Sequence, residues 1–243
     1  MKRVCASLFK LFLHFFFPRT CFACGCDLSW RSSVPLCPSC AGKLAAPGPH
    51  ICRRCGTVLK SGGAHCHACR GSKAEKYKCS VIRSAFVFNT PSRALVHALK
   101  YAKAEYLAAY MGRQMAFCFK KYPELAPAER VIPVPLFPKK GRARGYNQSD
   151  LLARHFAAQV GLSVDDTSLV RVRDTVSQTT LGRMGRLANM TGAFLCKNPA
   201  VVKGKTILLI DDVATTGATL EGCAVALKQA GAKKVLAYTF ARE

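Results

Sequence analysis

Two adjacent carboxylates followed by a loop of small residues form the part of this sequence with the clearest chemistry. The apolar run 205–210 predicts a buried strand, and Asp211 and Asp212 follow it directly. The small residues that follow are Val213, Ala214, Thr215, Thr216, Gly217, Ala218 and Thr219, and a helical pattern begins at about Ala218. Backbone amides at such a helix start can cradle a phosphate, and carboxylates accept hydrogen bonds from ribose hydroxyls. The stretch therefore predicts a site for a ribose 5-phosphate.

Four C-x-x-C pairs lie before residue 70 and use eight of the fourteen cysteines. Two such pairs about a dozen residues apart supply four thiolates, which is the usual shell of a structural zinc ion. Sequential pairing predicts two sites with the ligands Cys21, Cys24, Cys37 and Cys40, and Cys52, Cys55, Cys66 and Cys69. A crossed pairing of the four C-x-x-C pairs stays open at this point. Because a shell of four thiolates is closed, we expect both zinc ions to be structural rather than catalytic.

The layout of the cysteines and the N-terminal segment bear on location. Metal-type cysteine spacing predicts a reducing compartment, and we expect a cytoplasmic protein. The segment 1–17 has a basic start and an apolar run, like a signal peptide. However, Lys10 and His14 interrupt the run, no small-x-small cleavage site follows, and the run is too short to span a bilayer. The sequence thus predicts a short amphipathic helix there and no transmembrane segment.

The chain is strongly basic. Lys and Arg number 37 against 13 Asp and Glu, which gives a formal net charge of +24. Such a field attracts polyanions, including nucleic acid, nucleotides, phosphorylated sugars and anionic membrane surfaces. Charge alone does not separate these partners from a simple role in solubility. Half of the residues are hydrophobic, so a sizeable core is expected and disorder is not.

The composition changes near residue 75, which predicts an N-terminal helix and double zinc ribbon over 1–75 and an α/β domain over 76–243. Apolar runs predict strands at 81–88, 131–136, 205–210 and 235–240. Helical patterns begin at Ser92, at 106 and at Ser149 or Asp150, and a further helix covers 218–230. The segment 163–195 has weak periodicity and reads as irregular. Alternating strands and helices imply a parallel sheet with right-handed crossovers.

A basic stretch follows the predicted strand at 131–136. It reads as a loop with four cations and two glycines, and its cations can neutralise a pyrophosphate through lysine charge and bidentate arginine contacts. A solvated basic turn, or a contact to the phosphate backbone of DNA or RNA, would use the same side chains.

The block 207–219 resembles the motif of type I phosphoribosyltransferases that binds 5-phosphoribosyl-1-pyrophosphate (PRPP): an apolar strand, two acids and a T-T-G-x-T loop. Nearly the whole chain resembles the ComF family of amidophosphoribosyltransferase-like proteins, known from competence and DNA uptake in bacteria. Besides the zinc ribbons and the PRPP loop, the resemblance is carried by Leu99-Lys100-Tyr101, Val134-Pro135-Leu136, Arg144-Gly145-Tyr146-Asn147-Gln148, Gln178-x-x-Leu181 and Arg186-x-x-Asn189.

The resemblance implies a type I phosphoribosyltransferase-like parallel sheet with flanking helices, preceded by the small double zinc-ribbon module. It implies PRPP with Mg²⁺ as ligand, and Asp211 and Asp212 as the catalytic pair that fixes the ribose. It also implies a pyrophosphate loop with Lys139, Lys140, Arg142, Arg144, Gly145 and Asn147. A further segment, the hood that selects the nucleophile in such enzymes, would contain Gln178, Arg186 and Asn189.

Three functions stay open on the sequence. The first is a phosphoribosyltransferase with an unknown acceptor. The second is a PRPP-binding protein that handles single-stranded DNA in natural transformation, with a competence helicase as a candidate partner by family resemblance. The third is a PRPP-sensing regulator. The intact PRPP loop favours the first over the third and does not separate the first from the second.

Overall fold

The computed structural model describes residues 18–29, 31–60, 62–70, 77–174, 190 and 192–243. The helix predicted over 1–17 lies outside the described residues, as do the hood residues Gln178, Arg186 and Asn189. Within the described part of the chain, no helix is long and apolar enough to cross a membrane.

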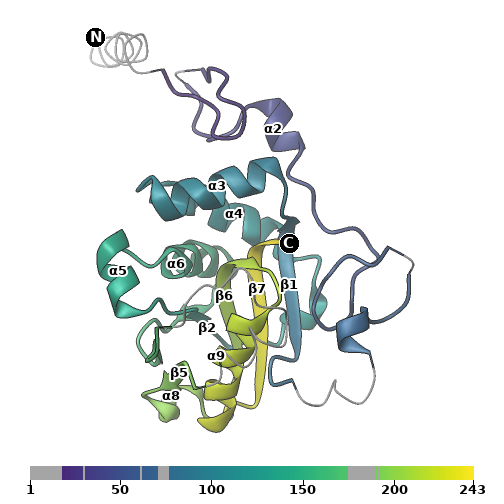
Figure 1. The fold of residues 1–243 in the computed structure, drawn as a ribbon, viewed down its shortest axis with the longest axis vertical. Coiled ribbons are helices and arrows are strands. Elements are labelled where there is room, and N and C mark those ends of the chain that lie inside the picture. Colours follow the sequence, from purple (N-terminus) through teal and green to yellow (C-terminus); the bar gives the residue numbers. More distant parts are fainter. Residues whose placement is uncertain (1–17, 30, 61, 71–76, 175–189, 191) are drawn as a thin grey trace.

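A five-stranded sheet with the order β1-β7-β6-β2-β3 forms the centre of the molecule (Figure 1). Its strands are β1 (Val81–Val87), β2 (Arg130–Pro133), β3 (Ser163–Val164), β6 (Thr206–Ala214) and β7 (Lys234–Arg242). All neighbouring pairs in this sheet are parallel, which confirms the predicted fold class. Central parallel strands are covered on both faces, and this explains the unbroken apolar run that delivers the two acids.

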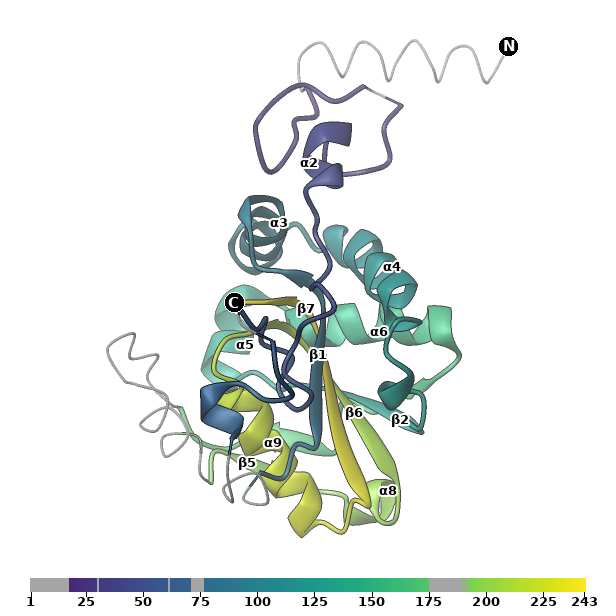
Figure 2. The ribbon, with the colours of Figure 1, turned by 90° about the vertical axis from the view of Figure 1, so that its right-hand side faces the viewer.

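Alternate residues of β6 enter two different cores, because side chains along a strand point to opposite faces. Leu208 and Ile210 pack with α3 (Thr90–Tyr101), α4 (Leu107–Phe119) and α6 (Gln148–Val160). Ile207 and Leu209 pack with α9 (Ala218–Gln229) on the other face. Figure 2 shows α9 on one side of the sheet and α4 and α6 on the other.

Several element boundaries differ from the predictions for local chemical reasons. Asn89, not Ser92, caps α3, and Ser92 completes a capping box from the N3 position. Asn147 caps α6 ahead of Ser149 and Asp150, since its side chain accepts a hydrogen bond from the Ser149 amide. The basic stretch predicted as a loop forms a helix, α5 (Pro138–Arg144). Its proline lies in the first turn, and the left-handed Gly145 ends it.

The region 163–195, predicted to be irregular, contributes β3 and the two strands of a small antiparallel pair. These strands are β4 (Leu169–Arg171) and β5 (Phe194–Cys196). They lie in the same core as α9. The short elements η3 (Pro123–Leu125) and α8 (Pro199–Val202) precede β2 and β6 respectively.

The two cysteine-rich ribbons dock on different parts of the α/β domain (Figure 1). The first, with α2 (Pro38–Gly42), places the Phe22 ring 6.4 Å from the ring of Tyr106, which caps α4. The second, with η1 (His67–Cys69), lies along β1, where the Ile82 amide donates a 2.8 Å hydrogen bond to the Arg54 carbonyl. Cysteines of the first ribbon belong to a core of the α/β domain, whereas Cys52, Cys55 and Cys69 of the second ribbon form a small cluster of their own beside β1.

Candidate functional site

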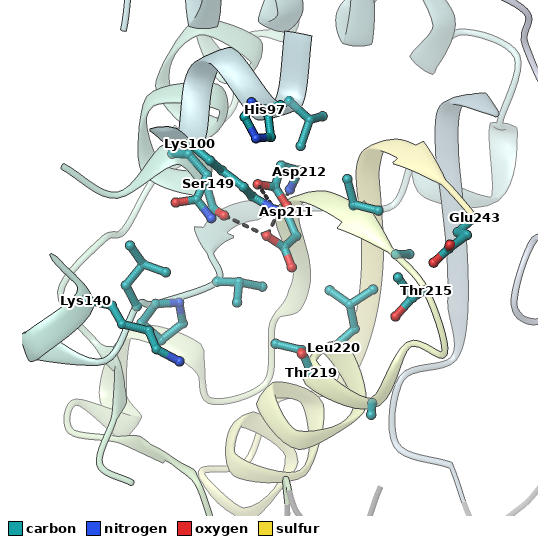
Figure 3. A pocket seen from close by; sticks show the side chains of 18 of the residues that line it. His97, Lys100, Lys140, Ser149, Asp211, Asp212, Thr215, Thr219, Leu220 and Glu243 are labelled. Carbon is teal, nitrogen blue, oxygen red and sulfur yellow. Dashed lines mark hydrogen bonds and ion pairs between the residues drawn. The ribbon is translucent and has the colours of Figure 1, made fainter. Parts of the chain in front are cut away.

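A cavity of about 1150 Å³ opens at the carboxyl ends of the central strands. Ligands of open α/β sheets bind at this edge, beside the loops that follow the strands. All residues of the predicted PRPP stretch, 211–219, line the cavity. Residues of α3, the segment after β2, α5 and the start of α6 also line it, together with Phe88, Arg171, Met190, Leu220 and Glu243. Figure 3 shows Asp211, Asp212, Thr215 and Thr219 around this space.

The phosphate-type loop, residues 213–219, covers the end of β6, the turn after it and the start of α9. β6 continues past the predicted end at residue 210, so both acids and Ala214 are still in the strand, with Ala214 opposite Arg242 of β7. Gly217 precedes α9 with φ +78°, in the left-handed region that side chains disfavour. A Cβ at this position would lie 3.1 Å from Ile82 Cδ1. The positive φ therefore requires a glycine for the turn, and a side chain here would also press on Ile82 of β1.

The two acids are buried and held by residues from two helices. Asp211 is 8% exposed and Asp212 is 3% exposed. The Ser149 hydroxyl of α6 donates a 2.7 Å hydrogen bond to Asp211 Oδ1, which also accepts the Asp212 amide at 2.9 Å. Lys100 Nζ of α3 lies 2.8 Å from Asp212 Oδ2 (Figure 3). The acid pair is thus oriented at the cavity wall, with the Lys100 ammonium as a compensating charge.

Burial and the Asp212 charge raise the pKa of Asp211 to about 7, although Lys100 and the Ser149 hydroxyl lower it. Burial works against the Lys100 ammonium, but the charge and hydrogen bond of Asp212, with smaller contributions from Asp211 and Tyr101, together outweigh it, so the pKa of Lys100 is raised. Near neutral pH the site therefore keeps a charged lysine beside a carboxyl group that is close to its own titration point.

This pKa predicts a pH-dependent stability. The folded protein binds the Asp211 proton more tightly than the unfolded chain, whose carboxyl pKa is about 4. The stabilising contribution of that proton is complete below about pH 4, and it is lost as the pH rises through the folded pKa of about 7. Because Asp211→Asn cannot titrate, its free energy of unfolding relative to the original protein should rise from pH 5 to pH 8. Urea unfolding at both pH values measures this, and a difference that is constant with pH would contradict the raised pKa.

Only part of the predicted pyrophosphate segment reaches the cavity. Lys140 and Arg144 line it, whereas Lys139 and Arg142 are exposed on α5 and are not among its lining residues. Lys140 Nζ lies 3.5 Å from Asp174 Oδ1. The Arg144 guanidinium donates to Gln148 and lies 5.5 Å from the centre of the Tyr101 ring.

The other two residues of this predicted set have structural contacts. Gly145 ends α5, and the Asn147 side chain donates to the Val134 carbonyl at 3.0 Å while capping α6. Lys140 and Arg144 reach the cavity while Lys139 and Arg142 do not, because successive side chains of the helix 138–144 point to different sides.

Sequence reasoning missed how Lys100 and Ser149 act in the site. Lys100 belongs to the Leu99-Lys100-Tyr101 motif, which does not indicate an ion pair, and the sequence pattern indicates Ser149 only as a helix start. Both side chains reach the acids from helices far away in the sequence. Glu243 also lines the cavity and adds a third carboxyl group near the loop.

The cysteines form two compact sets, Cys21, Cys24, Cys37 and Cys40, and Cys52, Cys55, Cys66 and Cys69. Within each set the sulfur atoms lie within 4.8 Å of one another, which confirms the sequential pairing. A tetrahedral zinc–thiolate shell places its sulfurs about 3.8 Å apart. The Cys24–Cys37 and Cys55–Cys66 sulfur distances are 3.8 Å and 3.6 Å, so the residues fit the metal.

Comparison with known proteins agrees with both parts of the molecule. Residues 12–70 match a family model for a double zinc ribbon domain, and residues 147–243 match one for a phosphoribosyl transferase domain. The DNA utilization protein YhgH of Salmonella typhimurium is 30% identical over 220 residues, covering 89% of this chain and 88% of that protein. Competence protein F of Haemophilus influenzae is 26% identical, with 93% and 98% coverage, and competence protein ComFC of Bacillus subtilis is 29% identical, with 89% and 90% coverage. This chain belongs to the ComF family.

In this ComF-family chain the phosphoribosyl transferase match begins at residue 147, at the cap of α6. It contains Ser149, both acids and the phosphate-type loop. Lys100, Lys140 and Arg144 come before the match but line the same cavity. The site is therefore assembled from the matched segment and from α3 and α5, which precede it.

Proposed function

We propose that this ComF-family protein binds PRPP with Mg²⁺ and transfers the phosphoribosyl group to an acceptor. The observation that supports this most directly is the arrangement around one cavity. The phosphate-type loop 213–219 lies at one part of its wall, the buried acids lie beside it, and Lys140 and Arg144 contribute positive charge. A phosphate, a ribose and a pyrophosphate each have a chemically matched group there.

The two acids and the loop would hold the ribose 5-phosphate. The amides at the start of α9, with the hydroxyls of Thr215, Thr216 and Thr219, suit a phosphate dianion. The Asp211 and Asp212 carboxylates would accept hydrogen bonds from the ribose 2′ and 3′ hydroxyls. The hydrogen bond from Ser149 and the ion pair with Lys100 keep these acids in place before the substrate enters.

The cationic side of the cavity would stabilise the leaving group. The bond from ribose C1 to the pyrophosphate oxygen breaks, and the oxygen keeps the electron pair. Lys140 and Arg144 would neutralise the resulting negative charge. The acceptor donates a lone pair to C1 and releases a proton. Carboxylate oxygens fit a hard cation, and Mg²⁺, when bound, supplies further positive charge for the pyrophosphate and orients the ribose hydroxyls.

Calorimetric titration of PRPP into the zinc-loaded protein tests this function. Saturable binding at one site per chain is expected with Mg²⁺, and weaker binding is expected without it. Pyrophosphate release with trial nitrogen acceptors would then separate turnover from binding alone. A lack of binding in both titrations would contradict the proposal.

Handling of single-stranded DNA is a second candidate function. It is supported by the relatives' names, which refer to DNA utilization and competence, and by the net charge of +24. Tyr101 is 66% exposed at the cavity and offers a ring on which a base can stack. A competence helicase is the partner that this reading predicts, and a reducing cytoplasm is the compartment that suits the thiolate sites.

The test of this second function is the salt dependence of binding to a labelled single-stranded oligonucleotide. Phosphate contacts give a steep fall in affinity as salt rises. The exposed cations Lys139 and Arg142 of α5 are suitable probes, and replacing both by alanine should reduce the log–log slope by about 1 to 2. Replacing the exposed Lys60, which lies in the second ribbon, serves as the comparison. An absence of binding at low salt would exclude this function.

A further inference from the structure

A buried ion pair connects the second zinc ribbon to the helix that carries the phosphate-type loop. Arg54 NH2 lies 3.1 Å from Glu221 Oε2, and the two side chains are only 10% and 11% exposed. Arg54 stands inside the knuckle between the zinc-type ligands Cys52 and Cys55. Glu221 lies in the first turn of α9, and its amide donates to the Gly217 carbonyl at 2.9 Å. The ion pair thus joins the knuckle to the first turn of α9, and the hydrogen bond from the Glu221 amide joins that turn to Gly217 of the loop.

Further contacts hold both charged groups. Arg54 NH1 lies 3.6 Å from Cys69 Sγ, and NH2 donates to the Cys79 carbonyl at 3.3 Å. The guanidinium lies 3.4 Å from the centre of the Tyr77 ring. Glu221 accepts the amides of Lys78 and Cys79. A buried pair with this many partners orients what it joins, and removing one member leaves an uncompensated charge.

The ribbon also reaches the loop by direct packing through β1. Gly56 has φ +71°, and a Cβ there would lie 2.7 Å from the Ile82 carbonyl oxygen. On the other side, Ile82 Cδ1 is the atom that limits space at Gly217. The knuckle, one strand of the sheet and the loop are therefore in successive contact. Displacement of the knuckle would remove support from Gly217.

A third contact joins the second ribbon to β7, the neighbour of the strand β6 that carries the two acids. Arg242 of β7 donates to Thr57 Oγ1 at 2.7 Å, and this oxygen lies 3.2 Å from Cys55 Sγ. Arg242 is the register partner of Ala214, the last residue of β6. The second ribbon therefore supports the loop from its strand side as well as from its helix side.

We propose that Arg54 and Glu221 are positioning residues through which the metal-loaded second ribbon holds the loop 213–219 in its ligand-binding conformation. Four thiolates on one ion fix the knuckle, and the knuckle fixes Arg54. Loss of the ion would free Arg54 and leave Glu221 buried without its counter-charge. The identity of the ligand as PRPP rests on the proposed function. The coupling between the second ribbon and the loop is a property of the protein without ligand.

The first ribbon provides an internal comparison. It contacts α4 through Phe22 and Tyr106, and the Asn89 side chain, which caps α3, donates to its Lys43 carbonyl at 2.7 Å. These contacts lie on the α3 and α4 side of the sheet, whereas α9 packs on the other face. Metal loss there should leave the loop 213–219 largely unchanged.

Hydrogen exchange of the unliganded protein tests the coupling. Cys66→Ser and Cys24→Ser each alter one tetrad at a more accessible ligand, since Cys66 is half-buried and Cys24 is exposed. Zinc content is measured for both variants. Amides 213–219 should exchange at least about fivefold faster in Cys66→Ser and at the original rate in Cys24→Ser. Unchanged exchange in a Cys66→Ser protein that has lost one zinc would overturn the proposal.

Glu221→Gln tests the link without touching a cysteine, and Asp166→Asn is its control because it breaks the surface ion pair with Arg154. Glu221→Gln should weaken PRPP binding at least about fivefold and speed zinc transfer to a chelator from one of the two sites. By the same linkage, PRPP should slow zinc release from the second ribbon of the original protein. Binding and zinc release equal to those of Asp166→Asn would overturn the coupling. If the original protein does not bind PRPP, the proposed function fails, and hydrogen exchange still decides the coupling.

Discussion

Replacement of Asp211 and Asp212 together by asparagine is expected to abolish saturable binding of PRPP with Mg²⁺. Each carboxylate would make charge-assisted hydrogen bonds to the ribose, and such bonds contribute about 1.5–3 kcal/mol each. The expected loss of affinity is therefore at least about 100-fold. Calorimetric titration measures it directly, and the substitution changes no side-chain size in the cavity.

Two controls make this result specific to the ribose site. Zinc content should stay at two ions per chain, since neither acid belongs to a cysteine set. Asp165→Asn changes a buried carboxyl group that bonds to the Thr167 and Ser168 amides at the end of β3, outside the cavity lining, and should keep PRPP affinity if the variant folds. Binding by the double variant at the original affinity would contradict the ribose assignment of both acids.

Lys100→Met is expected to lower the free energy of unfolding by about 2–4 kcal/mol, because it leaves the Asp212 carboxylate buried without its counter-charge. Asp212 is 3% exposed, whereas the Lys100 side chain keeps 22% of its surface exposed, which places the effect below that of a fully buried pair. Lys100 also lowers the pKa of Asp211, so its removal should raise that pKa further. Denaturant unfolding at pH 8 measures the loss.

A double-mutant cycle separates the ion pair from simple packing. Lys100→Met combined with Asp212→Asn should recover much of the lost stability, since the unpaired charge is then absent. Lys103→Met is the matched comparison, because Lys103 is exposed at the same cavity, and its effect should stay within about 0.5 kcal/mol. The single variant Asp212→Asn completes the cycle, and a loss in the double variant equal to the sum of the two single losses would show that the ion pair contributes nothing measurable.

The sequence by itself determined the features whose chemistry is local. Each C-x-x-C knuckle presents two thiolates within one turn of chain, so metal-type spacing could be recognised without knowledge of the fold. The stretch 205–219 contains a strand, two acids, a loop and a helix start in direct succession, and all of its predicted ligand residues line one cavity. The alternation of strands and helices was sufficient for the parallel sheet, because parallel neighbours require crossover connections.

Only the tertiary structure decided which distant residues complete these features. Lys100 and Ser149 meet the acids because α3 and α6 pack on the face of the sheet where Leu208 and Ile210 lie, and no local pattern encodes that meeting. Arg54 and Glu221 are 167 residues apart and meet because the second ribbon lies along β1. Their pairing depends on strand order and on burial, since an ion pair gains its strength from the surroundings that exclude water.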